Sequence, residues 1–297
     1  MDKQTTVEQA VNQLTDGMTV GIGGWGSRRK PMGLVRAICR SPLKDLTIVS
    51  YGGPDVGMLC ASGKVRKLIF GFVSLDVIAL DPHFRAARES GSIEVSEYDE
   101  GMLQWGLYAA GLRLPFLPTH VGLGTDVERL TGELRSIESP YGDGARLLAM
   151  PAIELDVALV HVDQADNSGN GQVLGSDPYF DDLFCQAARH RIASCERIVA
   201  TGQLLNDGCV HSLRMNRTML DNVVEVPRGA HPTSCPPEYG MDEQHLREYA
   251  SARDERSWTE YRQRYIDCAE DKYVEAVAGP DRVAARAPSP SSPGGPS

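Results

Sequence analysis

The chain has 297 residues, of which 41% are hydrophobic and 24% are charged, so it can bury either one large α/β domain or two small ones. Its formal net charge of -10 argues against nucleic acid as the main partner. No apolar run is long enough to cross a bilayer, the polar N-terminus is unlike a signal peptide, and the 7 scattered cysteines are typical of a reducing compartment. We therefore expect a cytoplasmic protein that does not span a membrane.

Helical and strand patterns alternate along the first half of the chain. Apolar residues with helical spacing predict a helix over 6–14, which Thr6 and Gln9 would cap and Gly17 would end. Strands are then expected at 18–22, 46–51, 67–73 and 93–97, and helices at 31–40, 83–90 and about 101–112. This alternation predicts an α/β fold with an open, mainly parallel sheet and helices on both faces.

The pattern continues in the second half. Residues 128–146 look like a surface excursion, and strands are expected at 157–162 and 198–201. Asp181 and Asp182 are expected to cap a helix that runs to about Arg191.

These elements are expected to form one α/β domain over residues 1–278, of which 238–278 would be a helical extension. The remaining residues, 279–297, are rich in Pro, Ser and Gly and are predicted to form a disordered tail.

The segment from Thr19 to Pro31 joins a predicted strand to a predicted helix. Its clustered glycines and basic residues are Gly21, Gly23, Gly24, Gly26, Arg28, Arg29 and Lys30. Glycine lets a ligand approach the backbone, and a helix N-terminus favours negative charge, so this corner predicts a site for a phosphorylated ligand. Two simpler interpretations stay open, because a tight structural turn also needs such glycines and a short basic run often forms only a solvated surface.

The spacing of Gly21, Gly23 and Gly26 also fits the dinucleotide-binding pattern, which expects an acidic residue at the end of the second strand. Here that strand ends in Gly52-Gly53-Pro54, and Asp55 comes late, inside a predicted turn. The glycines also begin inside the first strand rather than after it. These departures disfavour nicotinamide binding.

Three landmarks in order give the chain a resemblance to a known family. Asp16-Gly17, an apolar run, Gly23-Gly24-Trp25 and Pro31 resemble the first signature of the α subunits of family I coenzyme A transferases, with Trp25 in place of the usual phenylalanine. Leu114-Pro-Phe116 followed by a Gly-x-Gly-Thr loop resembles the second landmark, and His161 followed by Ala165-Asp166 resembles the third. The resemblance covers about residues 5–225 and implies the fold of such an α subunit.

In this family the first glycine loop lies near the bound coenzyme A thioester. The resemblance therefore implies substrate contacts from Gly23, Gly24, Trp25, Gly26, Arg28, Arg29, Lys30, Gly52, Gly53, Asp55 and His120. At His120 the resemblance leads us to expect an arginine nearby, so this residue departs from the pattern while still offering a hydrogen-bond donor. The thioester would be the substrate, and neither a cofactor nor a metal is expected.

Several segments narrow the resemblance to the branch of this family that hydrolyses cyclic, steroid-derived acyl-CoA. They are Trp25–Pro31, Tyr51–Asp55, Asp99–Leu103, Arg113–Pro118 and Asp177–Phe184. Such proteins pair with a β subunit, and we expect an α2β2 assembly. The β subunit of this branch lacks the glutamate nucleophile of ordinary transferases, and a glutamate in the α-subunit motif Asp-Glu-Gly-Met-Leu acts instead. That residue is Glu100 here, which implies a general base.

The role of Glu100 and the function of the whole chain are both open to other interpretations. A first-turn glutamate complements the helix dipole without any catalysis, and the helix N-terminus would lower its pKa unless burial at a subunit interface outweighs that effect. Three functions therefore stay open for the chain. The preferred one is a ring-opening hydrolase subunit; the others are a conventional transferase subunit that moves coenzyme A between carboxylic acids and a non-catalytic acyl-CoA-binding subunit.

Other polar residues predict structure rather than chemistry. His161 ends an apolar strand and is expected to be a satisfied core residue, and Asp166 is expected in a structural turn. Zinc-binding spacing is lacking in the set Cys209, His211, His231 and Cys235. The sequence has no Gly-x-Ser-x-Gly elbow, which argues against a stand-alone serine hydrolase.

Overall fold

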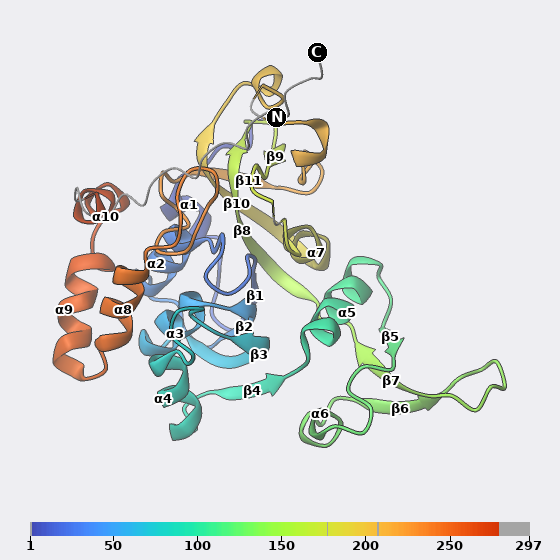
Figure 1. Ribbon diagram of the computed structural model, residues 1–297. Helices are drawn as coiled ribbons and strands as arrows, with labels where there is room; N and C mark the ends of the chain where they lie inside the picture. Colours follow the sequence, from blue (N-terminus) through green and yellow to red (C-terminus); the bar gives the residue numbers. More distant parts are fainter. Residues whose placement is uncertain (1, 177, 207, 279–297) are drawn as a thin grey trace, which may run out of the picture.

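The computed structural model describes residues 2–176, 178–206 and 208–278, so the tail predicted at 279–297 lies outside the described residues. The centre of the molecule is an 8-stranded sheet with the order β11-β10-β8-β1-β2-β3-β4 and with β9 paired to β8 (Figure 1). Pairs along this order are parallel, as predicted, and β9 is antiparallel to β8. The strands are β1 (Thr19–Ile22), β2 (Leu46–Gly52), β3 (Val65–Val73), β4 (Glu94–Glu97), β8 (Leu155–Ala165), β9 (Gly171–Gln172), β10 (Ala188–Ile198) and β11 (Asn222–Glu225).

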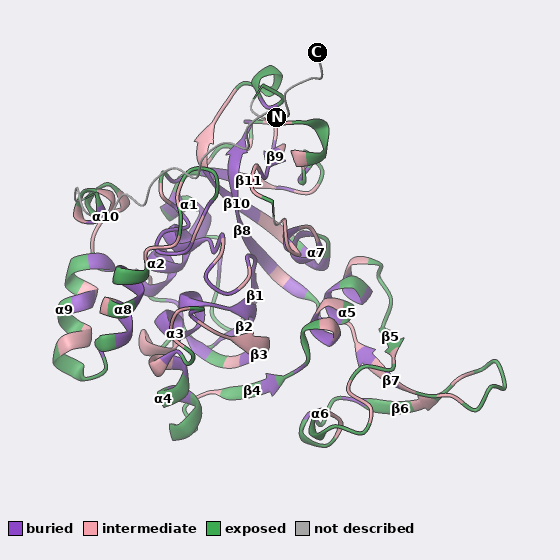
Figure 2. Cartoon of the chain, viewed as in Figure 1, coloured by how far each residue is buried: buried purple, intermediate pink, exposed green. Residues whose placement is uncertain are grey.

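Helices cover both faces of this sheet and divide the apolar interior into two clusters. Neighbouring residues of a strand point to opposite faces, so Ile48 belongs to one cluster and Val49 to the other. The first layer contains α1 (Val7–Val11), α2 (Met32–Arg40), α3 (Pro54–Ala61), α4 (Pro82–Ser90), α8 (Glu243–Ser251), α9 (Glu255–Tyr265) and α10 (Glu270–Val277). The second contains α5 (Glu100–Gly111) and α7 (Asp181–Ala187). Figure 2 shows strands β1 and β2 buried beside helices whose outer faces are exposed. Among the described helices, none is long and apolar enough to cross a membrane.

A smaller, 3-stranded antiparallel sheet adjoins α5. Its order is β5-β7-β6, and it comprises β5 (Phe116–Thr119), β6 (Arg135–Glu138) and β7 (Arg146–Pro151), with α6 (Asp126–Leu130) between β5 and β6. Leu148 and Met150 of β7 are buried in the same cluster as Met102 and Leu107 of α5, which attaches this sheet to the core. The segment 128–146, expected as a surface excursion, is therefore partly organised, although Figure 1 shows that the connection between β6 and β7 projects from the body.

Local signals account for several elements. Thr6 and Gln9 form the predicted capping box of α1. Leu34, Val35 and Ile38 are fully buried along one face of α2, as their spacing predicted.

Three predictions about element boundaries are wrong. The helix expected over 6–14 ends at Val11, with Asn12 at its C-cap, rather than near Gly17. The helix expected to reach Arg191 ends at Ala187, and the polar segment after it forms β10, because parallel pairing with β8 and β11 holds it extended. The strand expected at 198–201 is replaced by the end of β10 and a 3-10 turn at Thr201–Gln203. A second 3-10 turn spans Val210–Ser212.

Candidate active site

The carboxyl ends of β1, β2 and β3 meet at one edge of the sheet, which is where open parallel sheets bind their ligands. Residues 23–31, which we call the glycine corner, follow β1. The backbone N–H of Gly26 donates to the carbonyl of Tyr51 at the end of β2 (3.2 Å), and the N–H of Ser74 after β3 donates to the carbonyl of Gly52 (3.0 Å). These bonds join the three strand ends into one surface.

The backbone donors of the glycine corner already have partners within the chain. Each N–H group from residue 23 to residue 30 donates to a carbonyl, hydroxyl or carboxylate oxygen. The N–H of Gly24, for example, donates to Asp181 Oδ1 at 2.6 Å. These N–H groups are therefore satisfied within the folded chain, and the site for a phosphorylated ligand expected at this corner stays a prediction.

Close packing explains the glycines of this corner better. Gly24 has φ 74°, a left-handed conformation that favours glycine. A side chain on Gly53 would overlap the carbonyl oxygen of Gly26, and one on Gly23 would collide with Asp181. The glycines thus bring the loop after β1 against the end of β2 and the start of α7, which is the tight-turn interpretation.

Arg29 and Asp181 form a buried ion pair beneath the corner. Arg29 Nη1 lies 2.6 Å from Asp181 Oδ2 and donates to the carbonyl of His161 at 2.9 Å, and both side chains are 2% exposed. Asp181 was expected to cap a helix, but the residue before it, Phe180, occupies the cap position without a side-chain bond. The carboxylate instead holds Gly24 and Arg29, which lie more than 150 positions away in the sequence. No local pattern predicts such a partner.

The other two basic residues differ in exposure. Lys30 is fully buried, and its Nζ lies 2.8 Å from Ser50 Oγ and 3.4 Å from Asp55 Oδ2. Burial lowers the pKa of Lys30, and the Asp55 carboxylate opposes that effect. Asp55 also accepts a hydrogen bond from the N–H of Gly53 (2.7 Å). Asp55 lies in the first turn of α3, a helix that begins where only a turn was expected. Arg28 pairs with Asp76 (3.0 Å), but its side chain stays 37% exposed.

The solvated-surface interpretation of the basic run is therefore wrong for Arg29 and Lys30. Both stabilise the loop from inside, and Asp55 is part of the same interior. Arg28 is the member of the run that reaches the surface, so it is the best placed to contact a ligand.

Glu100 begins α5 beside the same strand ends. Asp99 caps the helix by accepting the N–H of Gly101 (2.8 Å). The hydroxyl of Tyr51 donates to the Glu100 carbonyl (2.9 Å), and Gly71 of β3 faces the Glu100 Cα so closely that a side chain there would be tight. The carboxylate itself is exposed in the single chain. Loss of solvent raises the pKa of Glu100, and the charge of Asp99 raises it further. The carboxylate is thus shifted in the direction that a general base requires.

Aromatic side chains extend from Glu100 to the glycine corner. We call Trp25, Phe72, Tyr179 and Phe180 the aromatic wall; all are partly exposed, and the fully buried Tyr51 supports them from behind. Phe72 meets Trp25 edge-on with 4.8 Å between ring centroids, and Trp25 stacks on Tyr179 at 5.7 Å. Phe180 lies 5.1 Å from Tyr51.

We did not predict from the sequence that Phe72, Tyr179 and Phe180 contribute to the candidate site. The segment 177–184 was noted only as a point of family resemblance, and Asp177 lies outside the described residues.

His120 lies in an exposed loop that returns to the start of α5. Gly122 of this loop faces the Met102 sulfur so closely that a side chain there would collide. His120 and Glu100 thus belong to neighbouring segments, and a substrate contact from His120 stays a prediction.

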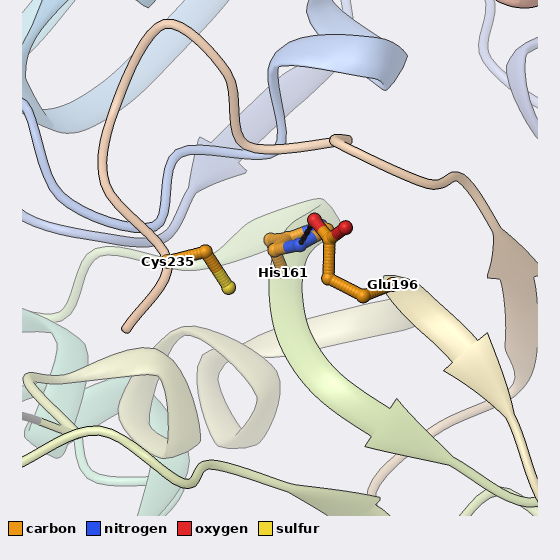
Figure 3. A group of neighbouring side chains, drawn as sticks. All are labelled: His161, Glu196 and Cys235. Atoms are coloured by element: carbon orange, nitrogen blue, oxygen red, sulfur yellow. Dashed lines mark hydrogen bonds and ion pairs between the residues drawn. The ribbon is translucent and has the colours of Figure 1, made fainter. Parts of the chain in front are cut away.

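A buried polar group lies directly behind the glycine corner. Figure 3 shows His161, Glu196 and Cys235, whose potential ligand atoms lie within 4.8 Å of one another. His161 bonds both Ser194 Oγ and Glu196 Oε1 at 2.9 Å, which confirms the predicted satisfied core histidine. Glu196 also accepts from the hydroxyl of Tyr239 (2.5 Å), and burial raises the pKa of the Cys235 thiol well above its usual value. A zinc ion would need these side chains to give up mutual bonds, so the arrangement fits a structural role.

A second such group joins the helical extension to the sheet. His231, Asp242 and His245 gather in the interior. The Tyr273 hydroxyl lies 2.7 Å from His231 Nδ1, and the Tyr261 hydroxyl lies 2.9 Å from His245 Nε2. These bonds fix the orientation of both rings against Tyr261 and Tyr273 of the first layer.

Comparison with known proteins gives a consistent result. The family model described as coenzyme A transferase matches residues 4–225. The cholesterol ring-cleaving hydrolase IpdA subunit of Rhodococcus jostii is 52% identical over 283 residues, covering 93% of this chain and 96% of that protein. The subunit of the same name from Mycobacterium tuberculosis is 51% identical, covering 93% and 97%.

Solved structures agree with the fold described above. Glutaconate coenzyme A-transferase from Acidaminococcus fermentans superimposes with a TM-score of 0.88 at 25% identity, covering 95% of this chain and 94% of that chain. The decarboxylase AibA/AibB superimposes with a TM-score of 0.76 at 28% identity, covering 94% and 99%. These likenesses extend over the sheet, both helix layers and the helical extension.

Proposed function

The chain belongs to the coenzyme A transferase family, and from this premise we propose that it is the α subunit of an enzyme that hydrolytically opens a ring of a steroid-derived acyl-CoA. Similarity to two subunits named as cholesterol ring-cleaving hydrolases supports the reaction class. The observation that carries the residue assignment is Glu100, a carboxylate with a raised pKa at the strand ends. Coenzyme A thioester is the substrate in this account, and no cofactor is invoked.

The proposed step uses Glu100 as a general base toward water. Glu100 accepts a proton as the water oxygen bonds to a ring carbonyl carbon. The bond from that carbon to the neighbouring α-carbon then breaks, and its electron pair is taken up as an enolate by a second carbonyl in the β position. Return of the proton from Glu100 to the α-carbon gives a ring-opened acyl-CoA with one new carboxylate.

The proposed assembly is a heteromer with a β subunit, as α2β2. Relatives named as A subunits support a partner in general. A partly exposed apolar surface on α5 and the segment leading into β5 supports it too: Trp105, Tyr108, Leu112, Leu114 and Phe116 are between 38% and 49% exposed. Monomeric proteins seldom leave so many large apolar side chains together at the surface. A partner seated there would cover the second half of α5, the helix that begins at Glu100.

The test is Glu100→Gln in the complex with its co-purified partner. The substitution keeps size and hydrogen bonding but removes the base, so we expect turnover of a cyclic β-diketone acyl-CoA to fall by about 100-fold or more while thioester binding persists. Glu94→Gln on β4, whose side chain is 68% exposed, is the matched control and should keep full turnover. Full turnover by Glu100→Gln contradicts the assignment and favours the acyl-CoA-binding interpretation.

A conventional transferase remains the second candidate, because the same fold is found in glutaconate coenzyme A-transferase. The two differ in what they require. A transferase needs a carboxylic acid acceptor, whereas the proposed hydrolase turns over with water alone.

A further inference from the structure

We propose that the aromatic wall binds the carbocyclic part of the acyl group and thereby sets the enzyme's preference for ring-bearing thioesters. This inference rests on the proposed function, since it places the ring beside Glu100. It concerns binding, however, and its test is independent of turnover.

The wall is continuous with the proposed base. The Tyr51 hydroxyl holds the Glu100 carbonyl at 2.9 Å, and the Tyr51 ring lies 6.0 Å from the Phe72 ring. Phe72 follows Gly71, which faces the Glu100 Cα. A ring resting on Phe72 would therefore lie next to the first turn of α5, where the carboxylate can reach a water molecule at its edge.

The wall also has the chemistry that an alicyclic ring requires. Trp25 contacts both Phe72 and Tyr179, and Phe180 packs against Tyr51, so these partly exposed rings are held in fixed orientations. Rigid aromatic faces bind saturated rings through buried apolar area and lose little side-chain entropy in doing so. A short acyl group such as acetyl offers almost none of this area. The wall should consequently favour the acyl groups of ring-bearing thioesters while leaving the affinity for the coenzyme itself unchanged.

The end of the wall opposite Glu100 carries charged side chains, which agrees with a ligand whose ring lies beside Glu100 and whose coenzyme lies at the other end. The Arg28 guanidinium lies 5.2 Å from the Trp25 ring centroid and is the part of the basic run that reaches the surface. Its partner Asp76 is also partly exposed. The surface thus changes from a carboxylate at Glu100, through aromatic rings, to the Arg28–Asp76 ion pair, in which the guanidinium is the more exposed partner. A ligand with a carbocycle at one end and phosphates at the other matches that order.

The test compares two thioesters that carry no cleavable β-diketone, cyclohexanecarbonyl-CoA and acetyl-CoA, by titration calorimetry on the complex with its partner. We expect the unmodified complex to bind the cyclohexane thioester about tenfold more tightly. Phe72→Leu and Trp25→Phe each shorten the aromatic surface and should lower that preference at least about threefold, with the acetyl-CoA dissociation constant unchanged. Trp25→Phe is a mild change, because phenylalanine keeps an aromatic ring at this position.

Trp258→Phe is the matched control, because Trp258 stacks on Tyr261 (5.7 Å) among the C-terminal helices and should leave both constants unchanged. Thermal midpoints equal to that of the unmodified complex establish that each variant is folded. The proposal is overturned if the unmodified complex shows no preference, if both wall variants keep it, or if they weaken both thioesters equally. If Glu100→Gln kept full turnover, the proposed catalytic role would fail, but the dissociation constants of the two thioesters would be unaffected. Failure of the proposed function and failure of this inference are therefore distinguishable.

Discussion

Glu100 lies where opposing influences on its pKa meet. A helix N-terminus stabilises a negative charge and lowers the pKa of a carboxyl group. Loss of solvent and the neighbouring Asp99 charge act in the other direction, and the net pKa of Glu100 is raised. The rise in pKa that the sequence led us to expect only from a subunit interface is thus partly present in the single chain.

This raised pKa gives a pH dependence with a defined sign. The base acts only when deprotonated, so kcat/KM should fall as pH drops through the pKa of Glu100, which lies above the ordinary glutamate value of about 4.3. Asp99→Asn keeps a helix-capping side chain but removes the charge that raises this pKa. We expect the acid limb of the kcat/KM profile of the complex to move to lower pH. Asp254→Asn, at the cap of α9, is the control. A limb that stays in place in Asp99→Asn contradicts the role of Glu100.

At the scale of elements, the periodicity of apolar residues was enough to predict the bounds of a helix or strand where burial follows one of its faces. The bounds of α2, β1 and β2 follow from their apolar spacing. The start of α3 was missed because Gly52-Gly53-Pro54 also has turn chemistry, although proline is common at a first helical position. The start of strand β10 was missed because its first residues are polar and have no strand pattern of their own. Pairing with β8 and β11, which lie elsewhere in the sequence, holds them extended.

The candidate site divides in the same way. The glycine corner and Glu100 could be found from motifs, because their residues are contiguous. The Arg29–Asp181 pair and the aromatic wall could not, because each joins segments that only the folded sheet brings together.

The Arg29–Asp181 pair fastens the glycine corner to α7, so its loss should destabilise the whole domain. Arg29→Met leaves a buried carboxylate without its counter-ion, and we expect the free energy of unfolding to fall by about 3–5 kcal/mol. Arg28→Met, one residue earlier, removes a partly exposed pair with Asp76 and should cost less than about 1 kcal/mol. Denaturant unfolding of both variants measures the difference. Equal losses would show that the buried pair has no special role in holding the corner.

At the scale of the molecule, one parallel sheet separates two layers with different tasks. The first layer, with α1 to α4 and α8 to α10, closes a large apolar cluster and contains the buried histidine–tyrosine network. The second layer, with α5, α7 and the small sheet, contains Glu100 and the exposed apolar surface around Leu114 and Phe116. The candidate site thus lies at the carboxyl ends of the strands, in the same layer as this exposed apolar surface.

The central claim is that this assembly adds water to a ring carbon and leaves the thioester intact. The most direct measurement is turnover of a cyclic β-diketone acyl-CoA by the complex in water enriched in heavy oxygen, without any carboxylic acid acceptor, followed by mass spectrometry of the product. The account predicts a ring-opened acyl-CoA with one heavy oxygen atom in its new carboxylate. No turnover until a carboxylic acid is added, with coenzyme A then found on that acid, would contradict the account and identify a transferase.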